Sequence, residues 1–388
     1  VVQDLDSTEI DRLVKAIKAA NVQSCAICFL FSHLRPDHEL ALADALRRSI
    51  HGLYVSASCE VQPEFREYER LSTTVLNAYL QPVMASYLAE LSDGVANFAP
   101  AARLGINQSS GGLISAARAA AVPVRTALSG PAAGAAGAIE VAVRSGIPNI
   151  ITLDIGGTSS DIALIVGGRA DMIHDRWIEG YPARLPSIDI NAVGAGGGSL
   201  AWIDAGGLLK VGPQSAGAMP GPACYNAGGT EPTVSDANLV LGRLSPAGLL
   251  NGSMPLRIDL AEAAIKQLAT RIGLTTEQAA LGIIDVAVAN MMRGIRTVSV
   301  ERGYDLRNFT LLGFGGAGPW HAAAVARSLG IKRLLIPPHP GLLCAQGLIV
   351  SDQREHLVRE ARLDLEADLV EKTRPLLDEL DREADAWF

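Results

Sequence analysis

Hydrophobic and polar residues alternate along the N-terminal part of the chain in a pattern that predicts helices and strands in turn. An amphipathic pattern predicts a helix over residues 7–20, and an apolar run predicts a buried strand over residues 24–31. A second helix is predicted over residues 36–49 and a second strand over residues 54–58. This alternation is typical of βα units, whose strands lie in a parallel or mixed sheet.

Longer helical segments are predicted in the rest of the chain. The pattern indicates a helix over about residues 71–91, a linker over residues 92–100, and two more helices over about residues 259–272 and 276–298. The highly charged residues 352–387 also follow a helical pattern, which predicts an exposed helix or an interface.

The most informative stretch lies between these helices, where two apolar, β-rich runs surround a polar glycine turn. The runs are residues 150–153 and 162–166, and the turn is Asp154-Ile-Gly-Gly-Thr-Ser-Ser-Asp161. No helical pattern follows the glycines. The sequence therefore predicts a strand, a tight turn and a second strand.

The composition of this turn suits a phosphate group. Gly156 and Gly157 place no Cβ between the backbone and an anion, and successive backbone N–H groups in such a turn form an anion-binding concavity. Thr158, Ser159 and Ser160 add hydroxyl donors. The alternative is an ordinary hairpin with a polar turn, because short motifs also occur by chance.

The two carboxylates of the turn, Asp154 and Asp161, repel phosphate and need a separate explanation. They become favourable if Mg²⁺ lies between carboxylate and phosphate, with waters completing its octahedral coordination. We therefore expect Asp154 and Asp161 to bind Mg²⁺ or its waters.

A second glycine turn follows a predicted strand and precedes a predicted helix. Its spacing, Gly313-x-Gly315-x-x-Gly318, matches the dinucleotide-binding fingerprint. That fingerprint requires an acidic residue at the end of the next strand, and residues 333–339 contain none. We therefore interpret Gly313, Gly315, Gly316 and Gly318 as a turn against another part of a nucleotide, such as adenosine.

Two further segments are unusual. Four glycines lie among residues 194–198, and each would cost about 1 kcal/mol relative to Ala inside a helix. They predict a loop that lies close to a ligand or to a crossing chain segment. Residues 211–243 are predicted to be mostly loop, and irregular segments of this length are often functional.

Composition limits the classes of function. The chain has 388 residues, 48% of them hydrophobic, which suggests two or three domains. Its 39 glycines and 5% aromatic content favour an α/β protein with many tight turns. The net charge of -8 argues against a nucleic-acid or anionic membrane partner. No apolar stretch reaches membrane-spanning length, so we expect no membrane association.

The five cysteines are odd in number and irregularly spaced, as in a reducing compartment, so we expect a cytoplasmic protein. Cys25 and Cys28 match C-x-x-C but lie in a predicted strand, where they point to opposite faces, so we interpret them as structural. His33 and His38 are interpreted as a surface pair, because no third metal ligand lies near them in the sequence.

Several long motifs occur in a fixed order along the chain. They are Pro63-Glu-Phe-Arg-Glu-Tyr-Glu-Arg, Ser129-Gly-Pro-Ala-Ala-Gly, Asp154-Ile-Gly-Gly-Thr-Ser-Ser-Asp, Val193-Gly-Ala-Gly-Gly-Gly-Ser, Ser215-Ala-Gly-Ala-Met-Pro-Gly-Pro-Ala-Cys-Tyr, Thr233-Val-Ser-Asp-Ala-Asn, Glu301-Arg-Gly and Gly313-Phe-Gly-Gly-Ala-Gly-Pro. In these motifs the chain resembles the hydantoinase/oxoprolinase family. This family includes the N-methylhydantoinase A subunit, the N-terminal half of 5-oxoprolinase and the nucleotide-binding subunit of ketone carboxylases.

The resemblance implies an α/β fold made of actin-like ATPase (ribonuclease H-like) lobes, with mixed sheets and flanking helices. Residues 1–100 would be a remnant of the first lobe plus a connecting helix, residues 101–351 the second lobe with glycine-rich insertions, and residues 352–388 a charged C-terminal helix. The family's phosphate turn of the first lobe is not found here, and the chain begins at Val1 within a helical pattern. We therefore expect an incomplete first lobe, cut from a longer protein, and no activity from this chain alone.

The mechanism that the resemblance implies is ATP-driven activation of a cyclic amide. ATP phosphorylates the carbonyl oxygen, and the C–N bond is then hydrolysed with help from a hydantoinase B-type partner subunit or domain. The resemblance assigns catalytic roles to Asp154, Asp161, Asp236 and His321. It assigns Mg²⁺ binding to Asp154 and Asp161, and substrate binding to Glu67 and Arg70. The residues assigned to ATP are Asp154, Gly156, Gly157, Thr158, Ser159, Gly313, Gly315, Gly316 and Gly318. For Glu67, Arg70, Asp236 and His321 a purely structural role remains an alternative.

Three functions remain open from the sequence. The first is a cyclic-amide hydrolase of the hydantoin or 5-oxoproline type. The second is a subunit of an ATP-dependent ketone carboxylase, which uses the same ATP chemistry on a ketone and bicarbonate. The third is a non-catalytic nucleotide-binding lobe. We also expect the protein to be an oligomer.

Overall fold

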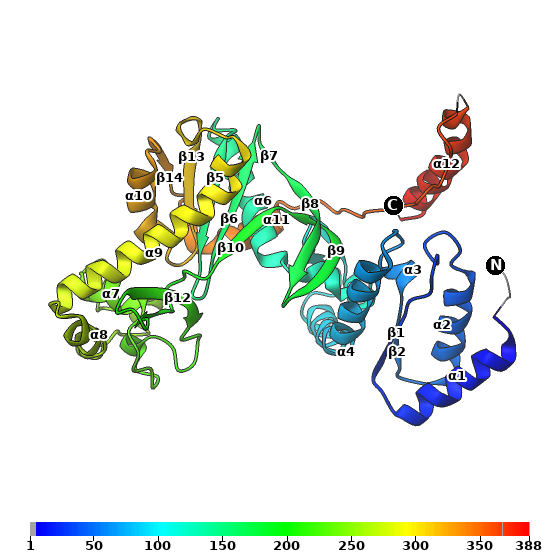
Figure 1. Ribbon diagram of the computed structural model, residues 1–388, viewed down its shortest axis with the longest axis horizontal. Helices are drawn as coiled ribbons and strands as arrows, with labels where there is room; N and C mark the ends of the chain where they lie inside the picture. The colour runs from blue at the N-terminus through cyan, green and yellow to red at the C-terminus, as the bar shows by residue number, and fades with distance from the viewer. Residues whose placement is uncertain (1–4, 367, 388) are drawn as a thin grey trace. The chain divides into compact units, whose positions relative to one another are not determined.

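The computed structural model describes residues 5–366 and 368–387, except the side chain of Asn251, and its chain forms two compact units (Figure 1). Unit 1 comprises the described residues up to Ser129, Met172–Ser187 and those from Asp352 onward. Unit 2 comprises Gly130–Asp171 and Ile188–Ser351. These boundaries differ from the predicted division into residues 1–100, 101–351 and 352–388, because the chain passes between the units more than once.

Unit 2 is built around a mixed sheet. Its strands are β5 (Ile150–Ile155), β6 (Ser160–Val166), β7 (Arg169–Ala170), β10 (Ile190–Val193), β13 (Thr310–Phe314) and β14 (Arg333–Leu335), in the order β10-β6-β5-β13-β14 with β7 paired to β6. The β5–β6 and β6–β10 pairs are antiparallel, whereas β13 is parallel to both β5 and β14. The predicted strand, turn and strand around the central glycines are confirmed as the β5–β6 hairpin.

Helices cover both faces of this sheet. They are α6 (Ser129–Arg144), α7 (Val234–Val240), α8 (Ile258–Ile272), α9 (Thr276–Val298), α10 (Gly318–Leu329) and α11 (Leu343–Ile349). Ile151 and Leu153 of β5 belong to the core with α9 and α10, and Figure 1 shows α9 crossing the sheet. Ile150 belongs to the core on the opposite face with α6 and α11. This alternation confirms the α/β class, and α8 and α9 lie within one residue of their predicted positions.

The segment predicted as a long loop over residues 211–243 contains regular structure. It includes most of the strand β12 (Leu209–Ser215), which pairs antiparallel with β11 (Ser199–Ile203), and a short 3-10 helix at Ala223–Tyr225. It also contains α7, whose start is capped by Thr233 and Asp236 in a capping box. The loop prediction missed this helix because its two turns are too short for a clear hydrophobic period.

Unit 1 contains the βα unit predicted at the N-terminus. The strands β1 (Ser24–Ile27) and β2 (Tyr54–Ala57) are parallel, and α1 (Ser7–Ala20) and α2 (Asp37–Ser49) pack their apolar residues against them. The strand predicted to reach residue 31 ends at Ile27, and the chain turns at Phe31, which has a positive φ of 60°.

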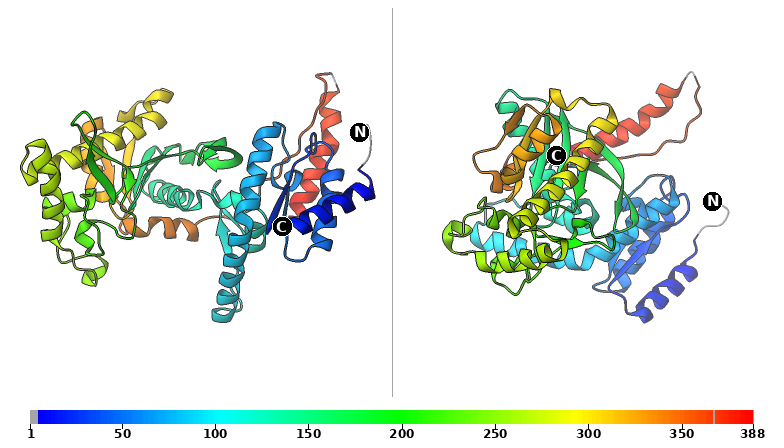
Figure 2. Two further views of the ribbon diagram at one scale, coloured as in Figure 1. Left: turned by 60° about the horizontal axis from the view of Figure 1, so that its bottom comes forward. Right: turned by 60° about the vertical axis from the view of Figure 1, so that its left-hand side comes forward.

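The helix predicted over residues 71–91 is longer at both ends. It is α4 (Glu67–Phe98), which follows the short α3 (Ser58–Val61), and Figure 2 shows its C-terminal turns extending beyond β1 and β2. The predicted linker over residues 92–100 is therefore wrong for residues 92–98. Its small and polar residues do not end the helix, and the Ser92 hydroxyl bonds the Leu88 carbonyl one turn earlier, at 2.7 Å.

Two hairpins and a helix complete the rest of this unit. The hairpins are β3 (Gly105–Asn107) with β4 (Leu113–Ser115) and β8 (Met172–Ile178) with β9 (Tyr181–Ile188), and the helix is α5 (Ala116–Ala121).

The charged C-terminal helix begins later than predicted. It is α12 (Leu369–Trp387), whereas residues 352–360 are not helical. Gln353 forms a parallel bridge with Leu113, whose N–H bonds the Asp352 carbonyl at 2.8 Å. The backbone groups of residues 352–354 are thus committed to a sheet edge, and this excludes a helix there.

Within the described residues, no single helix is long and apolar enough to cross a membrane, and only the bent pair α8 and α9 meets that criterion together. Both of these helices contribute to the core of unit 2.

Candidate functional site

The central turn has the geometry of a tight hairpin. The N–H of Gly156 donates to the Ser159 carbonyl at 3.1 Å and closes the turn. Asp154 and Asp161 are direct register partners across β5 and β6. Side chains of opposed residues point to the same face of a hairpin, so the two carboxylates lie side by side.

Asp154 is partly buried, and so is Asp161. Burial raises the pKa of the Asp154 carboxyl group above the usual value, and the Cys344 thiol partly offsets this shift by donating a hydrogen bond to Oδ2 at 3.4 Å. Burial and the adjacent carboxylate in turn raise the pKa of Cys344 to about 12. On the other strand, Ser159 Oγ donates to Oδ2 of Asp161 at 3.4 Å.

The sequence did not indicate a role for Cys344. It lies on α11, 190 positions from Asp154, and a single cysteine in an apolar segment has no local signal that would connect it with the turn.

The glycine-rich loop at residues 194–198 packs directly on the turn. The N–H groups of Gly197 and Gly198 donate to the carbonyls of Gly156 and Gly157, at 2.9 and 2.6 Å. A Cβ on Gly196 would lie 2.6 Å from the Thr158 carbonyl carbon, closer than real Cβ contacts allow. Of the two alternatives predicted for this loop, the structure shows the crossing chain segment, and the loop holds the turn in one shape.

The outer side of the turn is open. A Cβ added to Gly156 or Gly157 would have no atom of the described residues within 4 Å. The backbone of the turn can therefore be approached closely by an anion, as its composition predicts.

The second glycine turn lies at the same edge of the sheet. β13 is parallel to β5, with Gly313 opposite Leu153, so the two strands have their carboxyl ends at the same edge of the sheet. The Ala317 N–H donates to the Ile155 carbonyl at 2.9 Å and ties the two turns together. Ligands of open α/β sheets bind outside this carboxyl edge.

The four glycines of this turn have different roles. Gly315 has φ of 80°, and a Cβ there would lie 2.3 Å from Asp154 Oδ1. Gly313 packs closely against the Ala322 side chain, and Gly318 packs closely against the Leu153 carbonyl. The space beside Gly316 is open. The structure thus brings the predicted phosphate turn and the predicted adenosine-side turn together, within one unit.

Asp236 has a structural role at the start of α7. It is fully buried and accepts hydrogen bonds from the N–H groups of Cys224 and Thr233, at 2.7 and 2.9 Å, and from the Thr233 hydroxyl at 2.7 Å. These bonds cap α7 and fix the loop before it. Both carboxylate oxygens are thus committed to the fold, and a catalytic role for Asp236 stays a prediction.

His321 is also fully buried, on α10. Burial, assisted by Arg243, lowers the pKa of His321 to about 4, so the ring is neutral at neutral pH. Its Nε2 lies 3.3 Å from the Asn238 amide nitrogen, and Nδ1 has no hydrogen-bond partner among the described residues. The ring lies in the interior of unit 2, on the first turn of the helix that begins at Gly318, and a catalytic role for His321 stays a prediction.

Glu67 and Arg70 belong to unit 1, at the start of α4. Arg70 is fully buried, and its guanidinium donates to Ser58 Oγ at 3.1 Å and to the Phe29 carbonyl at 2.7 Å. It also bonds His33 Nδ1 at 2.8 Å, so its donors are committed to the fold. Glu67 is exposed on the first turn of α4.

Unit 1 also contains a cavity of about 540 Å³, and no predicted site residue lines it. The arginines in its wall are paired, Arg118 and Arg125 with Glu355 and Arg359 with Glu379. In the part of the chain that the structure describes, no cluster of three or more His, Cys, Asp or Glu side chains forms a protein metal cage. A pair of carboxylates is compatible with Mg²⁺, which usually keeps several waters.

A mixed sheet with helices on both faces, and two glycine turns at its carboxyl edge, define an actin-like ATPase fold. The chain belongs to the hydantoinase/oxoprolinase family. The family model described as hydantoinase/oxoprolinase matches residues 70–357, and the model of the N-terminal region of that family matches residues 1–50.

Individual relatives agree with this assignment. Caprolactamase subunit alpha from Pseudomonas jessenii is 42% identical over 351 residues, which cover 90% of this chain and 50% of that protein. The crystal structure of the ATP-dependent caprolactamase from the same organism matches with a TM-score of 0.82 and 39% identity, over 99% of this chain and 56% of that one. A nucleotide-free acetone carboxylase structure matches with a TM-score of 0.79 and 30% identity, over 90% and 50% of the two chains. The chain thus spans about half the length of these relatives.

Proposed function

We propose that this chain is the nucleotide-binding part of an ATP-dependent hydrolase of a cyclic amide, of the hydantoin, 5-oxoproline or lactam type. The observation that carries the proposal is the meeting of the Asp154–Asp161 turn with the Gly315–Gly318 turn at one sheet edge. Membership of the hydantoinase/oxoprolinase family and similarity to an ATP-dependent caprolactamase support the type of reaction.

The residues at this edge fit a magnesium–nucleotide complex. Asp154 and Asp161 lie opposite each other beside a turn that is open on its outer side. Burial raises the pKa of Asp154, and a nearby divalent cation would favour its ionised form. We therefore assign Asp154 and Asp161 to Mg²⁺ or its waters.

Bound ATP would supply the phosphoryl group that makes the amide carbonyl reactive, and Mg²⁺ would neutralise phosphate charge. The protein's part is positioning. Backbone N–H groups of Gly157 and Thr158 and the hydroxyls of Thr158 and Ser159 would bind phosphate oxygens. The bonds from Gly197 and Gly198 hold this turn in place before any ligand arrives, which reduces the cost of ordering it.

Thermal unfolding of the chain tests the nucleotide site. We expect Mg-ATP to raise Tm, ATP with a chelator to raise it less, and NAD to leave it unchanged. Ligand at 100 times its Kd stabilises by about 2.7 kcal/mol, which corresponds to a rise of a few degrees. Asp154→Asn should remove the magnesium-dependent part of the shift, whereas Asp285→Asn, at an exposed position of α9, should retain it.

Two results would count against the proposal. A shift with NAD alone would restore the dinucleotide interpretation of the Gly313 turn. An absence of any shift with Mg-ATP would leave the chain as a lobe that does not bind nucleotide by itself.

A ketone carboxylase subunit is the second candidate, favoured by the similarity to acetone carboxylase at 30% identity. ADP release by the complete enzyme separates the two. Stimulation by hydantoin, 5-oxoproline or a lactam supports the hydrolase, whereas stimulation only by a ketone with bicarbonate supports the carboxylase. If neither substrate stimulates ADP release, the third candidate applies, a nucleotide-binding lobe without catalysis.

The partner in this proposal is a hydantoinase B-type subunit or domain, and the assembly is an oligomer. The support is that one relative is named as a subunit alpha. The location proposed is the cytoplasm, since all five cysteines are free thiols in the structure.

A further inference from the structure

The cavity in unit 1 is large enough for a small molecule. Its volume of about 540 Å³ lies in the range of roughly 300–1,000 Å³ that is typical of ligand pockets. All the residues that line it belong to unit 1, and none of them belongs to the two glycine turns of unit 2. The segment 356–360, which is neither helix nor strand, lines it along its whole length.

The wall carries an excess of positive charge where the C-terminal segment passes α5. Arg118 and Arg125 both line the cavity, and both pair with the single carboxylate of Glu355. Burial and the neighbouring Arg118 lower the pKa of Arg125, as expected where two cations share one anion. His356 also lines the cavity, and its buried Nε2 has no hydrogen-bond partner among the described residues. Because a guanidinium has five N–H donors, this end of the wall can bind a second carboxylate.

Glu360, at the other end of this segment, has the opposite imbalance. Its Oε2 lies 3.6 Å from Nε2 of His33 and has no hydrogen-bond partner among the described residues. Nδ1 of His33 lies 2.8 Å from a guanidinium nitrogen of Arg70, which can only donate, so Nδ1 accepts and the ring carries its proton on Nε2. The imidazole therefore supplies no positive charge, and Glu360 is a carboxylate without a cationic partner.

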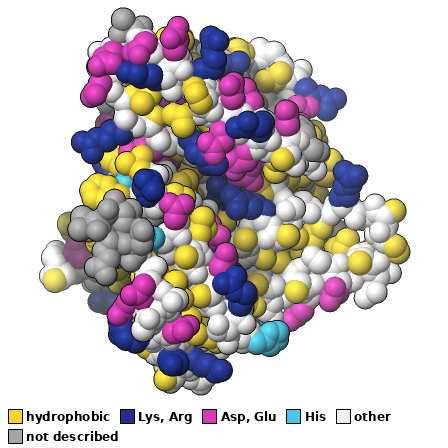
Figure 3. Space-filling view, turned by 90° about the vertical axis from the view of Figure 1, so that its right-hand side faces the viewer, with side chains coloured by type: hydrophobic (Ala, Val, Ile, Leu, Met, Phe, Trp, Pro, Cys, Tyr) yellow, Lys and Arg dark blue, Asp and Glu magenta, His cyan; other side chains and the backbone are white. Residues whose placement is uncertain are grey.

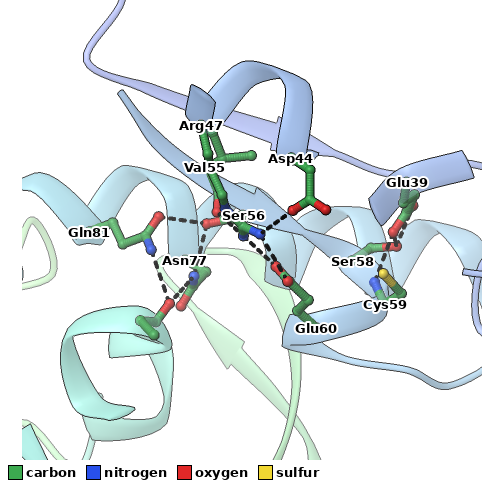
Figure 4. A network of polar contacts seen from close by, with 11 residues as sticks. Glu39, Asp44, Arg47, Val55, Ser56, Ser58, Cys59, Glu60, Asn77 and Gln81 are labelled. Carbon is green, nitrogen blue, oxygen red and sulfur yellow. Dashed lines mark hydrogen bonds and ion pairs between the residues drawn. The ribbon is translucent and has the colours of Figure 1, made fainter. Parts of the chain in front are cut away.

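The remaining charged side chains of the wall have partners. The ion pairs are Glu60 with Arg47, Glu64 with Arg184, and Arg359 with Glu379 and Glu383 of α12. Figure 4 shows the first of them, in which Arg47 reaches Glu60 beside Cys59. Since two carboxylates share Arg359, the excess negative charge lies next to Glu360 in the chain.

The surface around the cavity does not favour one sign of charge. In the space-filling view of the face that carries α1, α2 and α12, basic and acidic side chains are interspersed (Figure 3). Selection of a ligand by charge therefore falls to the wall of the cavity itself.

Apolar side chains make up much of the rest of the wall. Leu357 and Val358 lie between the two charged ends along the chain, and Leu34, Leu40 and Leu376 line the same cavity. The five residue steps from position 355 to position 360 span up to about 17 Å in an extended chain. An α-amino acid, whose two charged groups are attached to one carbon atom, is too short to reach both ends. A chain of several methylene groups suits both the span and the apolar wall.

We propose that the cavity of unit 1 binds a linear ω-amino acid. The carboxylate of the ligand pairs with Arg118 and Arg125, its ammonium group pairs with Glu360, and its methylene groups lie against the leucines of the wall. Such a ligand supplies the counter-charge that each end of the cavity lacks. Hydrolysis of a lactam produces an amino acid of this class, so the product of the proposed reaction is included; this identification rests on the proposed function, whereas the binding site does not.

Isothermal titration calorimetry of the whole chain with 6-aminohexanoate tests this site. We expect saturable binding of one molecule per chain. Hexanoate and hexylamine should each bind at least tenfold more weakly, because each leaves one end of the cavity without its counter-charge. Glycine should also bind at least tenfold more weakly, because it cannot reach both ends.

Two variants examine the two ends separately. Glu360→Gln should weaken the binding of 6-aminohexanoate and hexylamine about tenfold or more and leave that of hexanoate unchanged. Arg118→Gln should weaken 6-aminohexanoate and hexanoate and leave hexylamine unchanged. Glu262→Gln and Arg271→Gln, at exposed positions of α8 in unit 2, are the matched controls and should bind like the wild type. Circular dichroism should show that all four variants are folded.

Three results would overturn the proposal. They are an absence of saturable binding of 6-aminohexanoate, equal binding of hexanoate or glycine, and a Glu360→Gln variant that binds 6-aminohexanoate like the wild type. The Mg-ATP shift in Tm is measured on the same chain without the amino acid. Loss of that shift with normal 6-aminohexanoate binding would count against the proposed function alone, and the reverse result would count against the cavity site alone.

Discussion

At the scale of single residues, the contact between Cys344 and Asp154 is the feature with the clearest chemical consequence. Burial disfavours the charged form of Asp154. The thiol donates a hydrogen bond to this carboxylate and so stabilises the charged form, which binding of Mg²⁺ requires. The carboxylate in turn keeps the thiol protonated. Cys344 is therefore a group that holds Asp154 in place and is itself unreactive.

This coupling predicts a change in thiol reactivity. Burial is the largest cause of the raised pKa of Cys344, and Asp154 is the next. We expect Asp154→Asn to lower the pKa of the thiol and to speed its alkylation by iodoacetamide about three- to tenfold at fixed pH. Mass spectrometry of the peptide containing Cys344 measures the rate. Asp285→Asn should leave it unchanged, and an unaltered rate in Asp154→Asn would show that the contact is absent in solution.

At the scale of elements, the glycine loop at residues 194–198 acts as a clamp on the β5–β6 turn. Two loop N–H groups bond two turn carbonyls, and the backbone of Gly196 lies against Thr158. The turn has few contacts on its outer side, so this clamp is what fixes its shape.

Substitution of Gly196 by Ala should disturb the turn. The added Cβ meets backbone atoms of Thr158, which cannot move aside as a flexible side chain would. We expect Gly196→Ala to destabilise the fold by about 1–3 kcal/mol and to abolish the Mg-ATP shift in Tm. Gly130→Ala, on α6 where a Cβ meets no atom of the described residues within 4 Å, is the control and should keep both properties. Normal nucleotide binding by Gly196→Ala would contradict the role of the clamp.

At the scale of the whole molecule, unit 1 is assembled from segments that are far apart in the sequence. The Glu355 side chain, 7% exposed, pairs with Arg125 and lies 3.5 Å from Arg118. Together with the bridge between Gln353 and Leu113, this pairing holds the C-terminal segment on the rest of unit 1.

The pH dependence of stability should report this pairing. Burial alone would raise the pKa of Glu355, but Arg125 and Arg118 outweigh it and lower the pKa below its usual value. The pairing therefore stabilises the fold above the unfolded pKa of about 4.3, and this stabilisation is lost as the pH falls through the folded pKa.

Glu355→Gln should cost about 2–4 kcal/mol at neutral pH, because it leaves Arg125, whose side chain is only 14% exposed, without its charge partner. The difference from wild type should shrink as the pH falls below about 4. Urea unfolding across this pH range measures it, and Glu262→Gln, at an exposed position of α8, should show no such difference at any pH. A constant difference at all pH values would show that packing and not charge is responsible.

Much of unit 2 could be predicted from the sequence because its signals are local. The apolar runs and the glycines between Asp154 and Asp161 specified the hairpin, and the periodicity of α8 and α9 specified their extent within one residue. The end of α4 and the start of α12 were misplaced. No stop signal follows Leu91, so α4 continues to Phe98, whereas backbone bonding of residues 352–354 to Leu113 excludes an earlier start of the C-terminal helix.

By itself, the sequence determined the class of fold, the two glycine turns and the type of ligand that they suit, because these depend on backbone geometry within a few residues. Only the tertiary structure decided which groups meet. It placed Cys344 beside Asp154, enclosed Asp236 and His321 in the interior, and turned the apolar side of α4 to the solvent. These outcomes depend on contacts between residues far apart in the chain, which no local pattern encodes.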